Sequence, residues 1–318
     1  MSKWSKLGWT VGMGSAVLVA AHLINRFIFS NATAERLSDA ENKLTFNWKF
    51  GDVMYTVSGS GSPVLMIHDL NCYSSKFEWN RIYENISAHH TVYCMDLLGC
   101  GESDKPNLTY TAYMYTQLIN DFCSIIIKEP TDIVATGASA PLAIMSAAMK
   151  SSLFKKIILV SPQDIERAMI GPDKYSNIRR IILASPIIGT TVYNLFMRKA
   201  MLRRMLCNDI FYDPSAIPSH VLDTFYYDAH MGGSTAKYLF TSTQCGYTTS
   251  SIYNAVSSLD NSIYIISGDA EKRSASIVNE YTSINPSIEA VTIGNAKHLP
   301  QIEQPKDFIK QLNLFLND

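Results

Sequence analysis

Residues 133–149 read IVATGASAPLAIMSAAM: an apolar run, a turn of small residues and a second apolar run. The first run predicts the end of a buried strand, and the run after the proline predicts a helix. A serine on such a sharp turn projects its hydroxyl from the sheet edge, provided that the residues two positions away are small. Gly137 meets this requirement, and Pro141 is tolerated because the first turn of a helix needs no N–H at that position. Ser139 is therefore predicted to be a nucleophile, and the N–H of Ala140 is predicted to bind the developing oxyanion.

The segments around this turn alternate between short apolar runs and helical stretches. Continuous apolar runs indicate strands that are covered on both faces, as crossover helices cover a parallel sheet. The sequence therefore predicts an α/β fold with a mostly parallel, doubly wound sheet. The predicted buried strands are residues 63–67, 91–95, 132–135, 156–160, 262–266 and 290–293, and a hairpin is predicted from 44–50 and 53–58.

The alternation of strand and helix patterns is interrupted once after the first predicted strands. Residues 163–247 are helical or irregular and contain several arginines and aromatic residues, without a strand of the same kind. We expect them to form a helical cap over the carboxyl ends of the strands, where open α/β sheets bind ligands. The α/β core is then residues 43–162 and 248–318.

Length and composition agree with a folded globular protein. The chain has 318 residues, of which 47% are apolar and 17% charged, so a large core can form. The formal net charge is −1 and no long basic run is present, which argues against nucleic acid as a partner. Six cysteines are scattered singly, without the pairing of a zinc site, and are expected to be mostly free thiols.

Five segments resemble the α/β-hydrolase fold family in the family's own order. They are VLMIHDL (64–70), DLLGCGESDKP (96–106), GASAP (137–141), SGDAE (267–271) and HLPQIEQPKDF (298–308). The resemblance extends from about residue 50 to the C-terminus, apart from the cap. It implies that His298 is the catalytic histidine, and a serine nucleophile needs such a base together with an acid that orients it.

The resemblance leaves the acid open between three residues. Counting three positions on from Gly268 favours Glu271, while Asp269 and Asp164 remain alternatives. The resemblance also implies that the N–H of Leu70 is the second donor to the oxyanion. Asp69 departs from the family by standing where relatives carry glycine, and a carboxylate there would oppose an oxyanion unless it is paired or turned away.

These residues predict a serine hydrolase that cleaves a carboxylic ester or a related acyl substrate through an acyl-enzyme, without a metal or an organic cofactor. A serine nucleophile also excludes the attack by aspartate that dehalogenase-like and epoxide-hydrolase-like relatives use. The aromatic cap favours a hydrophobic small-molecule substrate. Alternatives are a C–C bond hydrolase, an amidase or an acyltransferase on the same fold, or a catalytically silent, membrane-tethered binding protein whose Asp69 and Pro141 mark a decayed site.

The N-terminal segment predicts a membrane anchor. Residues 7–24 are almost entirely apolar or small, and Lys3, Lys6 and Arg26 flank them. We expect residues 1–29 to form a single-pass anchor helix and residues 30–42 a linker. A signal peptide cleaved near Ala32 and Ala34, or a helix packed on the body, are alternatives. The positive charges before the apolar run favour a cytosolic N-terminus and an extracytoplasmic α/β domain. Free cysteines instead favour the cytosol for that domain, because an oxidising exterior would threaten the thiols.

Overall fold

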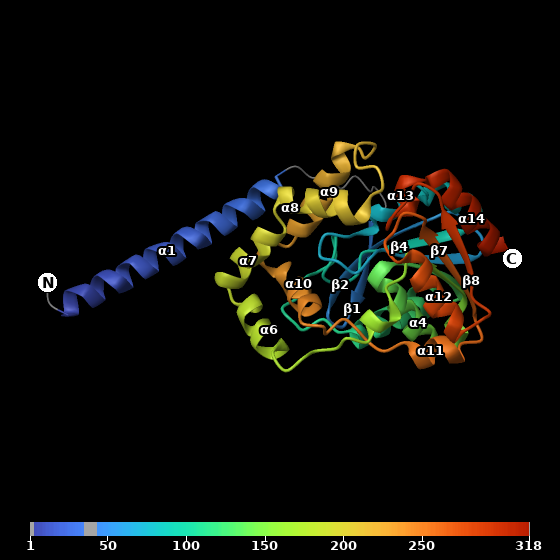
Figure 1. Ribbon diagram of the computed structural model, residues 1–318, viewed down its shortest axis with the longest axis horizontal. Helices are drawn as coiled ribbons and strands as arrows, with labels where there is room; N and C mark the ends of the chain where they lie inside the picture. Colours follow the sequence, from blue (N-terminus) through green and yellow to red (C-terminus); the bar gives the residue numbers. More distant parts are fainter. Residues whose placement is uncertain (1–2, 35–42, 318) are drawn as a thin grey trace.

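A computed structural model describes residues 3–34 and 43–317, and its centre is an eight-stranded sheet (Figure 1). The spatial order of the strands is β1-β2-β4-β3-β5-β6-β7-β8. Their bounds are β1 Lys43–Trp48, β2 Gly51–Ser58, β3 Pro63–Ile67, β4 Thr91–Met95, β5 Thr131–Thr136, β6 Phe154–Val160, β7 Ser262–Gly268 and β8 Glu289–Ile293. Strands β1 and β2 form the predicted hairpin, and β2 also pairs antiparallel with β4. All other pairs are parallel, which confirms the predicted α/β sheet.

Helices cover the two faces of the sheet and explain the continuous apolar runs. On one face, Leu65 and Ile133 pack in a core with helices α3 (Ala112–Phe122), α4 (Ala140–Met149) and α12 (Ser274–Ile284). On the other, Val64 and Val134 pack with α2 (Tyr83–Ser87) and α14 (Pro305–Asn317). Successive strand residues point to opposite faces, so both sets must be apolar.

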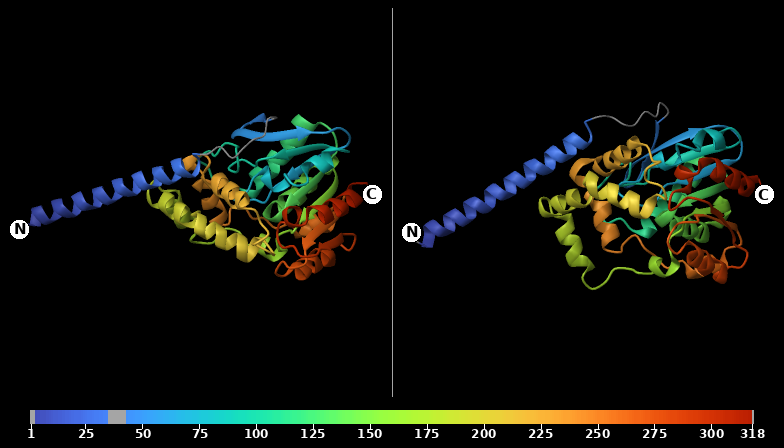
Figure 2. Two further views of the ribbon diagram at one scale, coloured as in Figure 1. Left: turned by 90° about the horizontal axis from the view of Figure 1, so that it is seen from above. Right: turned by 45° about the horizontal axis from the view of Figure 1, so that its top comes forward.

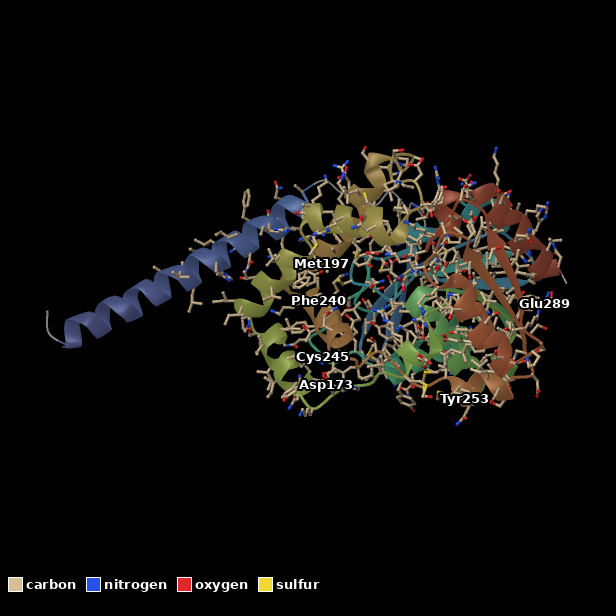
Figure 3. The ribbon with its side chains drawn as sticks, viewed as in Figure 1. Asp173, Met197, Phe240, Cys245, Tyr253 and Glu289 are labelled. Atoms are coloured by element: carbon tan, nitrogen blue, oxygen red, sulfur yellow. The ribbon has the colours of Figure 1, made fainter. Side chains whose placement is uncertain are left out.

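Residues 163–247, which we call the cap, lie between β6 and β7 and contain helices and loops in the described structure. The cap helices are α5 Ile165–Ala168, α6 Ser176–Ala184, α7 Ile188–Phe196, α8 Lys199–Met205, α9 Ser219–His230 and α10 Lys237–Gln244, and α11 Tyr253–Ser258 follows them. Their buried side chains join the core on one face of the sheet, and within it Tyr193 packs against Phe240 with ring centroids 5.6 Å apart. Figure 3 labels Phe240 and Met197, both buried, within this part of the molecule.

Helix α1 (Lys3–Ala32) projects from the cap side of the molecule as a long single rod (Figures 1 and 2). Its C-terminal end packs on α7 and α9. Asn25 donates a hydrogen bond to Thr191 (3.0 Å) and accepts one from Asn194 (2.9 Å). Phe29 is buried against Tyr193. This end of α1 is therefore part of the globular body.

The prediction of a single-pass membrane anchor over residues 1–29 is wrong. Within the described residues, no helix is both long enough and apolar enough to cross a bilayer. The apolar run that suggested an anchor continues into a polar stretch with Asn25, Arg26, Ser30 and Asn31, and Asn25 is buried against the cap. Of the predicted linker 30–42, residues 30–32 belong to α1, and residues 35–42 lie outside the described part of the chain.

All six cysteines are free thiols, as the scattered spacing predicts. Cys72, Cys94, Cys100, Cys123 and Cys245 are buried, and burial raises the pKa of the Cys72 thiol to about 12. A buried, protonated thiol is a poor nucleophile. The cysteines therefore act as small apolar residues of the core.

Truncating Phe29 tests the docking of α1 on the cap. Phe29→Ala removes a buried aromatic side chain and should lower the free energy of unfolding by about 3 kcal/mol, measured by urea denaturation. Phe27 lies two residues away on the same helix and is 69% exposed, so Phe27→Ala should change it by less than about 0.5 kcal/mol. Equal effects of the two substitutions would show that the end of α1 does not pack on the body.

Candidate active site

Four loops at the carboxyl ends of parallel strands form the candidate site. The loop after β3 carries Asp69, the turn after β5 carries Gly137, the loop after β7 carries Glu271, and the turn after β8 carries His298. Strands β3, β5, β6, β7 and β8 are consecutive in the sheet, so these loops meet at one edge. This is the ligand-binding edge of an open α/β sheet.

His298 and Glu271 form a hydrogen-bonded pair. The Nδ1 atom of His298 lies 2.8 Å from Oε1 of Glu271. The two alternative acids are engaged elsewhere: Asp269 accepts the N–H of Ala296 at 3.4 Å, and Asp164 accepts the N–H of Arg167 at 3.1 Å at the start of α5. The geometry therefore singles out Glu271 as the partner of the histidine.

The turn after β5 differs from the prediction in its register. The residue with positive φ at its apex is Gly137 (φ 55°), whereas Ser139 has φ −82° and begins helix α4. The Ser139 side chain is completely buried, and its Oγ donates to the carbonyl of His68 at 2.6 Å. The structure therefore does not bring Ser139 to His298. Glycine takes the apex because it adopts positive φ without strain.

Because Gly137 is the apex of the turn, the N–H groups predicted to bind the oxyanion do not both lie where the prediction put them. The N–H of Ala140 donates to the carbonyl of Gly137, inside the turn, and so does not face a substrate. The residue that follows the apex is Ala138, and its N–H donates to Oδ1 of Asp69 at 2.7 Å. Leu70 has a buried side chain, and its backbone follows Asp69 in the loop after β3. Leu70 stands between Asp69 and Asn71, which line the cavity, but is not itself a lining residue.

The Asp69 carboxylate fills the space beside the apex. Its Oδ1 binds the N–H of Ala138, and its Oδ2 accepts from Nδ2 of Asn71 at 2.6 Å and lies 3.1 Å from Nε2 of His298. A Cβ atom built on Gly137 would lie only 2.6 Å from Cγ of Asp69. A side chain at the apex and the carboxylate of Asp69 would thus compete for one volume. The aspartate that departs from the family pattern occupies the place of a nucleophile.

The charges in this cluster are coupled. Burial opposes the charged form of His298, but the hydrogen bonds to Asp69 and Glu271 outweigh it and hold the pKa of His298 well above its usual value. Burial likewise raises the pKa of Asp69, but the hydrogen bond to His298 reverses the effect, so that this pKa is lowered. Both shifts favour an imidazolium beside the Asp69 carboxylate.

His68 fixes the loop that carries Asp69. Its Nε2 accepts the N–H of Leu97 at 3.0 Å, so its proton is on Nδ1, which donates to the carbonyl of Asp69 at 2.7 Å. Burial lowers the pKa of His68, in agreement with a neutral ring. His68 is therefore a structural clamp on the β3 loop.

Glu78 is a buried carboxyl group that no sequence pattern singles out. It lies in a short 3-10 turn, η1 (Lys76–Trp79), and its Oε2 accepts the N–H of Asp69 at 3.0 Å. Burial, together with the negative charge of Asp69, raises the pKa of Glu78 to about 8. No motif or periodicity surrounds this residue, so only its position in space reveals it.

A cavity of about 540 Å³ opens onto this cluster. Asp69, Gly137, Glu271 and His298 line it from the sheet edge, and Met205 and Ile210 line it from the cap. The N–H of His298 donates to the carbonyl of Ile210 at 3.1 Å, which joins the cap to the histidine turn. Ser139 is not among the lining residues. Within the described residues, no group of three or more His, Cys, Asp or Glu is arranged to hold a metal ion.

Comparison with known proteins agrees with this fold. The model of the alpha/beta hydrolase family matches residues 61–311. The chain belongs to this family. An uncharacterized protein of Mycobacterium tuberculosis is 32% identical over 107 residues, and this match covers 34% of the chain but only 31% of that relative's length.

Solved structures extend the likeness to most of the chain. A serine hydrolase involved in carbazole degradation has a TM-score of 0.71 at 15% identity, over 87% of this chain and 99% of that one. The epoxide hydrolase CorEH also has a TM-score of 0.71, at 16% identity, over 87% of this chain and 98% of its own. At such identities the likeness establishes the fold, and the reaction depends on the residues of the site.

Neutralising Asp69 tests the ion cluster. Asp69→Asn removes one of the two carboxylates that bind His298 and should lower the pKa of this histidine by about 1 to 3 units. The pKa can be measured by NMR titration of the imidazole. Asp269→Asn is the matched control because Asp269 is exposed and makes no contact with His298. An unchanged pKa in Asp69→Asn would mean that Asp69 does not face the ring in solution.

Glu78 should make stability depend on pH. Between its ordinary pKa of 4.5 and about 8, the folded protein holds one proton more than the unfolded chain, so the free energy of unfolding falls as pH rises. Glu78→Gln keeps an acceptor for the N–H of Asp69 and should make the slope less steep by up to about 1.4 kcal/mol per pH unit. The rest of the slope remains, because the pKa values of His298 and Asp228 are also raised by folding. Denaturation curves from pH 5 to 8 measure it, with the exposed Glu84→Gln as control. A slope in Glu78→Gln as steep as in the wild type would contradict the assignment.

Proposed function

We propose that this chain is a hydrolase of small organic substrates in which the His298–Glu271 pair transfers the proton and Ser139 forms no covalent intermediate. The observation that carries the proposal is the position of His298: Nδ1 on Glu271, and Nε2 directed at the Asp69 carboxylate in the cavity. Glu271 orients the ring and stabilises its charge, as the acid of a hydrolase triad does. Nε2, which bonds to Asp69, is then the ring nitrogen on the cavity side.

Ester cleavage through Ser139 has less support. That mechanism needs the hydroxyl within hydrogen-bond reach of Nε2, but the hydroxyl is buried and bonded to the carbonyl of His68. A change of rotamer is insufficient, because Ser139 is the N-cap residue of α4 and lies outside the cavity lining. The same objection applies to the C–C hydrolase, amidase and acyltransferase alternatives, which would share the serine.

A silent binding protein is the second candidate. Gly137 offers no nucleophile at the apex, and the carboxylate of Asp69 already occupies the N–H of Ala138. In that case the cavity would bind a small molecule without converting it. The ionised cluster argues against this alternative, since a buried imidazolium beside a carboxylate is costly to maintain without a function.

Activity measurements decide between the candidates. Purified protein is screened with p-nitrophenyl esters, alkyl bromides and terminal epoxides. His298→Ala and Glu271→Gln should each lower kcat/KM about 10²- to 10⁴-fold on the active class. Asp269→Asn, the neighbouring carboxylate that does not bind His298, should leave it within a factor of about two. Absence of turnover in every class would favour the binding protein.

Ser139→Ala separates the serine mechanism from ours. The variant should retain full activity, and a fluorophosphonate probe should not label Ser139 in the wild type. Labelling that disappears in Ser139→Ala, together with lost hydrolysis, would restore the serine esterase and overturn the proposal.

A further inference from the structure

The outer edge of the cap exposes an unusual number of large apolar side chains. Helices α6 and α7 form this edge, which we call the cap edge, and lie far from strand β8 and the C-terminus (Figures 1 and 2). Contiguous apolar surface of this kind marks a site of interaction rather than a surface suited to water. Nine side chains of the cap edge and the segment before it are 46–66% exposed: Met169, Ile170, Tyr175, Ile178, Ile181, Ile182, Ile188, Leu195 and Phe196.

The exposed residues of α6 lie on one side of the helix. Ile178, Ile181 and Ile182 are 50–59% exposed and have the i, i+3, i+4 spacing that places side chains on a common face. Helix α6 packs on α7 and α10, and the residue of α6 that is buried is a serine, Ser176. The apolar face of this helix is therefore directed toward solvent and not toward the cap.

Helix α7 shows the same reversal of the usual arrangement. Thr190 and Asn194 are buried and hydrogen-bonded to α10 and α1, respectively. Ile188 and Leu195 are 59% and 56% exposed. Exposing apolar residues while burying polar ones is favourable where an apolar phase covers the exposed side. Both helices of the cap edge thus have a surface suited to an apolar environment.

The same part of the cap is strongly basic. Residues 165–207 contain eight arginines and lysines but two acidic residues, a formal charge of +6 in a chain whose net charge is −1. Arg179 and Lys199 are paired with acids. The exposed Arg198 and Arg204 form no salt bridge within the described residues. Apolar side chains flanked by arginines are typical of helices that lie in the interface of an anionic bilayer.

The positive charge decides which occupant suits the cap edge. The commonest symmetric dimer pairs one surface patch with the same patch of a second copy. Here such a dimer would bring two segments of charge +6 together, and like charges oppose the contact. An anionic lipid surface attracts the arginines and also receives the isoleucines. The observations therefore favour lipid over a second copy of the chain.

We propose that the cap edge docks on the surface of a bilayer that contains anionic lipids. Ile178, Ile181 and Ile188 enter the boundary between headgroups and acyl chains, while Arg198 and Arg204 face the lipid phosphates. The contact is with one leaflet and needs no helix that crosses the bilayer. None of these five residues lines the active-site cavity, so docking and hydrolysis can be tested separately.

Co-sedimentation of the whole chain with lipid vesicles tests the docking. One set of vesicles is phosphatidylcholine alone, and in the other about one lipid in three is phosphatidylserine. The protein should bind the anionic vesicles at least about tenfold more tightly, and added salt should weaken this binding. No binding to the anionic vesicles, or equal binding to both sets, would overturn the proposal.

Substitution of two exposed isoleucines tests the apolar contact. The double variant Ile178→Gln with Ile181→Gln should lower the affinity for anionic vesicles at least about tenfold, because less apolar surface enters the leaflet. The matched control is Ile125→Gln with Leu314→Gln, since these residues are 52% and 58% exposed but lie outside the cap. It should bind as the wild type does. Equal affinity of the two double variants would contradict docking through α6.

Substitution of two arginines tests the charged contact. Arg198→Gln with Arg204→Gln should lower the affinity for anionic vesicles about tenfold or more and should make it less sensitive to salt. Lys306→Gln with Lys310→Gln removes the same charge from exposed positions of α14 and should have little effect. If both pairs weaken binding equally, the net charge of the protein is responsible and the cap edge is not the docking surface.

Size-exclusion chromatography without lipid identifies the competing occupant. The wild type and the double variant Ile178→Gln with Ile181→Gln should elute at the same volume, with unchanged circular dichroism spectra. A wild-type dimer that this variant dissociates, together with a failure to bind vesicles, would assign the cap edge to a second copy of the chain and refute lipid docking.

Discussion

The hydrogen bond from the N–H of Ala138 to the carboxylate of Asp69 is the interaction on which the geometry of the site depends. It fixes the β3 loop against the β5 turn, and so determines what His298 faces. The turn can accept the carboxylate only because its apex lacks a side chain. With Asp69 in this position, the pKa of His298 is raised, and Glu271 bonds to the other ring nitrogen. One backbone amide thus sets the protonation of a histidine contributed by a distant part of the chain.

The fold could be predicted from the sequence because its determinants are local patterns. Continuous apolar runs such as Pro63–Ile67 identified the buried strands, and the crossover helices followed from them. His298 and Glu271 could also be selected, since each follows a strand at a spacing that the fold constrains. The choice of Glu271 over Asp269 agrees with the structure, where only the longer side chain bonds to the ring.

The turn after β5 could not be predicted correctly from local sequence patterns. Thr136, Gly137, Ala138 and Ser139 are all small, so several registers satisfy the steric rule, and a serine attracts the assignment because it has a hydroxyl. In the structure the residue with positive φ at the apex of the turn is Gly137, which decides between these registers. The sequence marked Asp69 as unusual but could not give the direction of its side chain. Glu78 and the docked end of α1 depend on tertiary contacts between segments far apart in the chain, which no local pattern records.

The glycine at the apex and the aspartate on the β3 loop also constrain each other's replacement. Because a Cβ atom on Gly137 would lie 2.6 Å from Cγ of Asp69, a lone change from glycine to serine meets a steric conflict before it gains a reactive hydroxyl. A lone change of Asp69 to glycine removes the carboxylate but leaves the apex without a side chain. A hydroxyl at the apex therefore requires paired substitutions at positions 69 and 137, because the change at position 137 alone is strained.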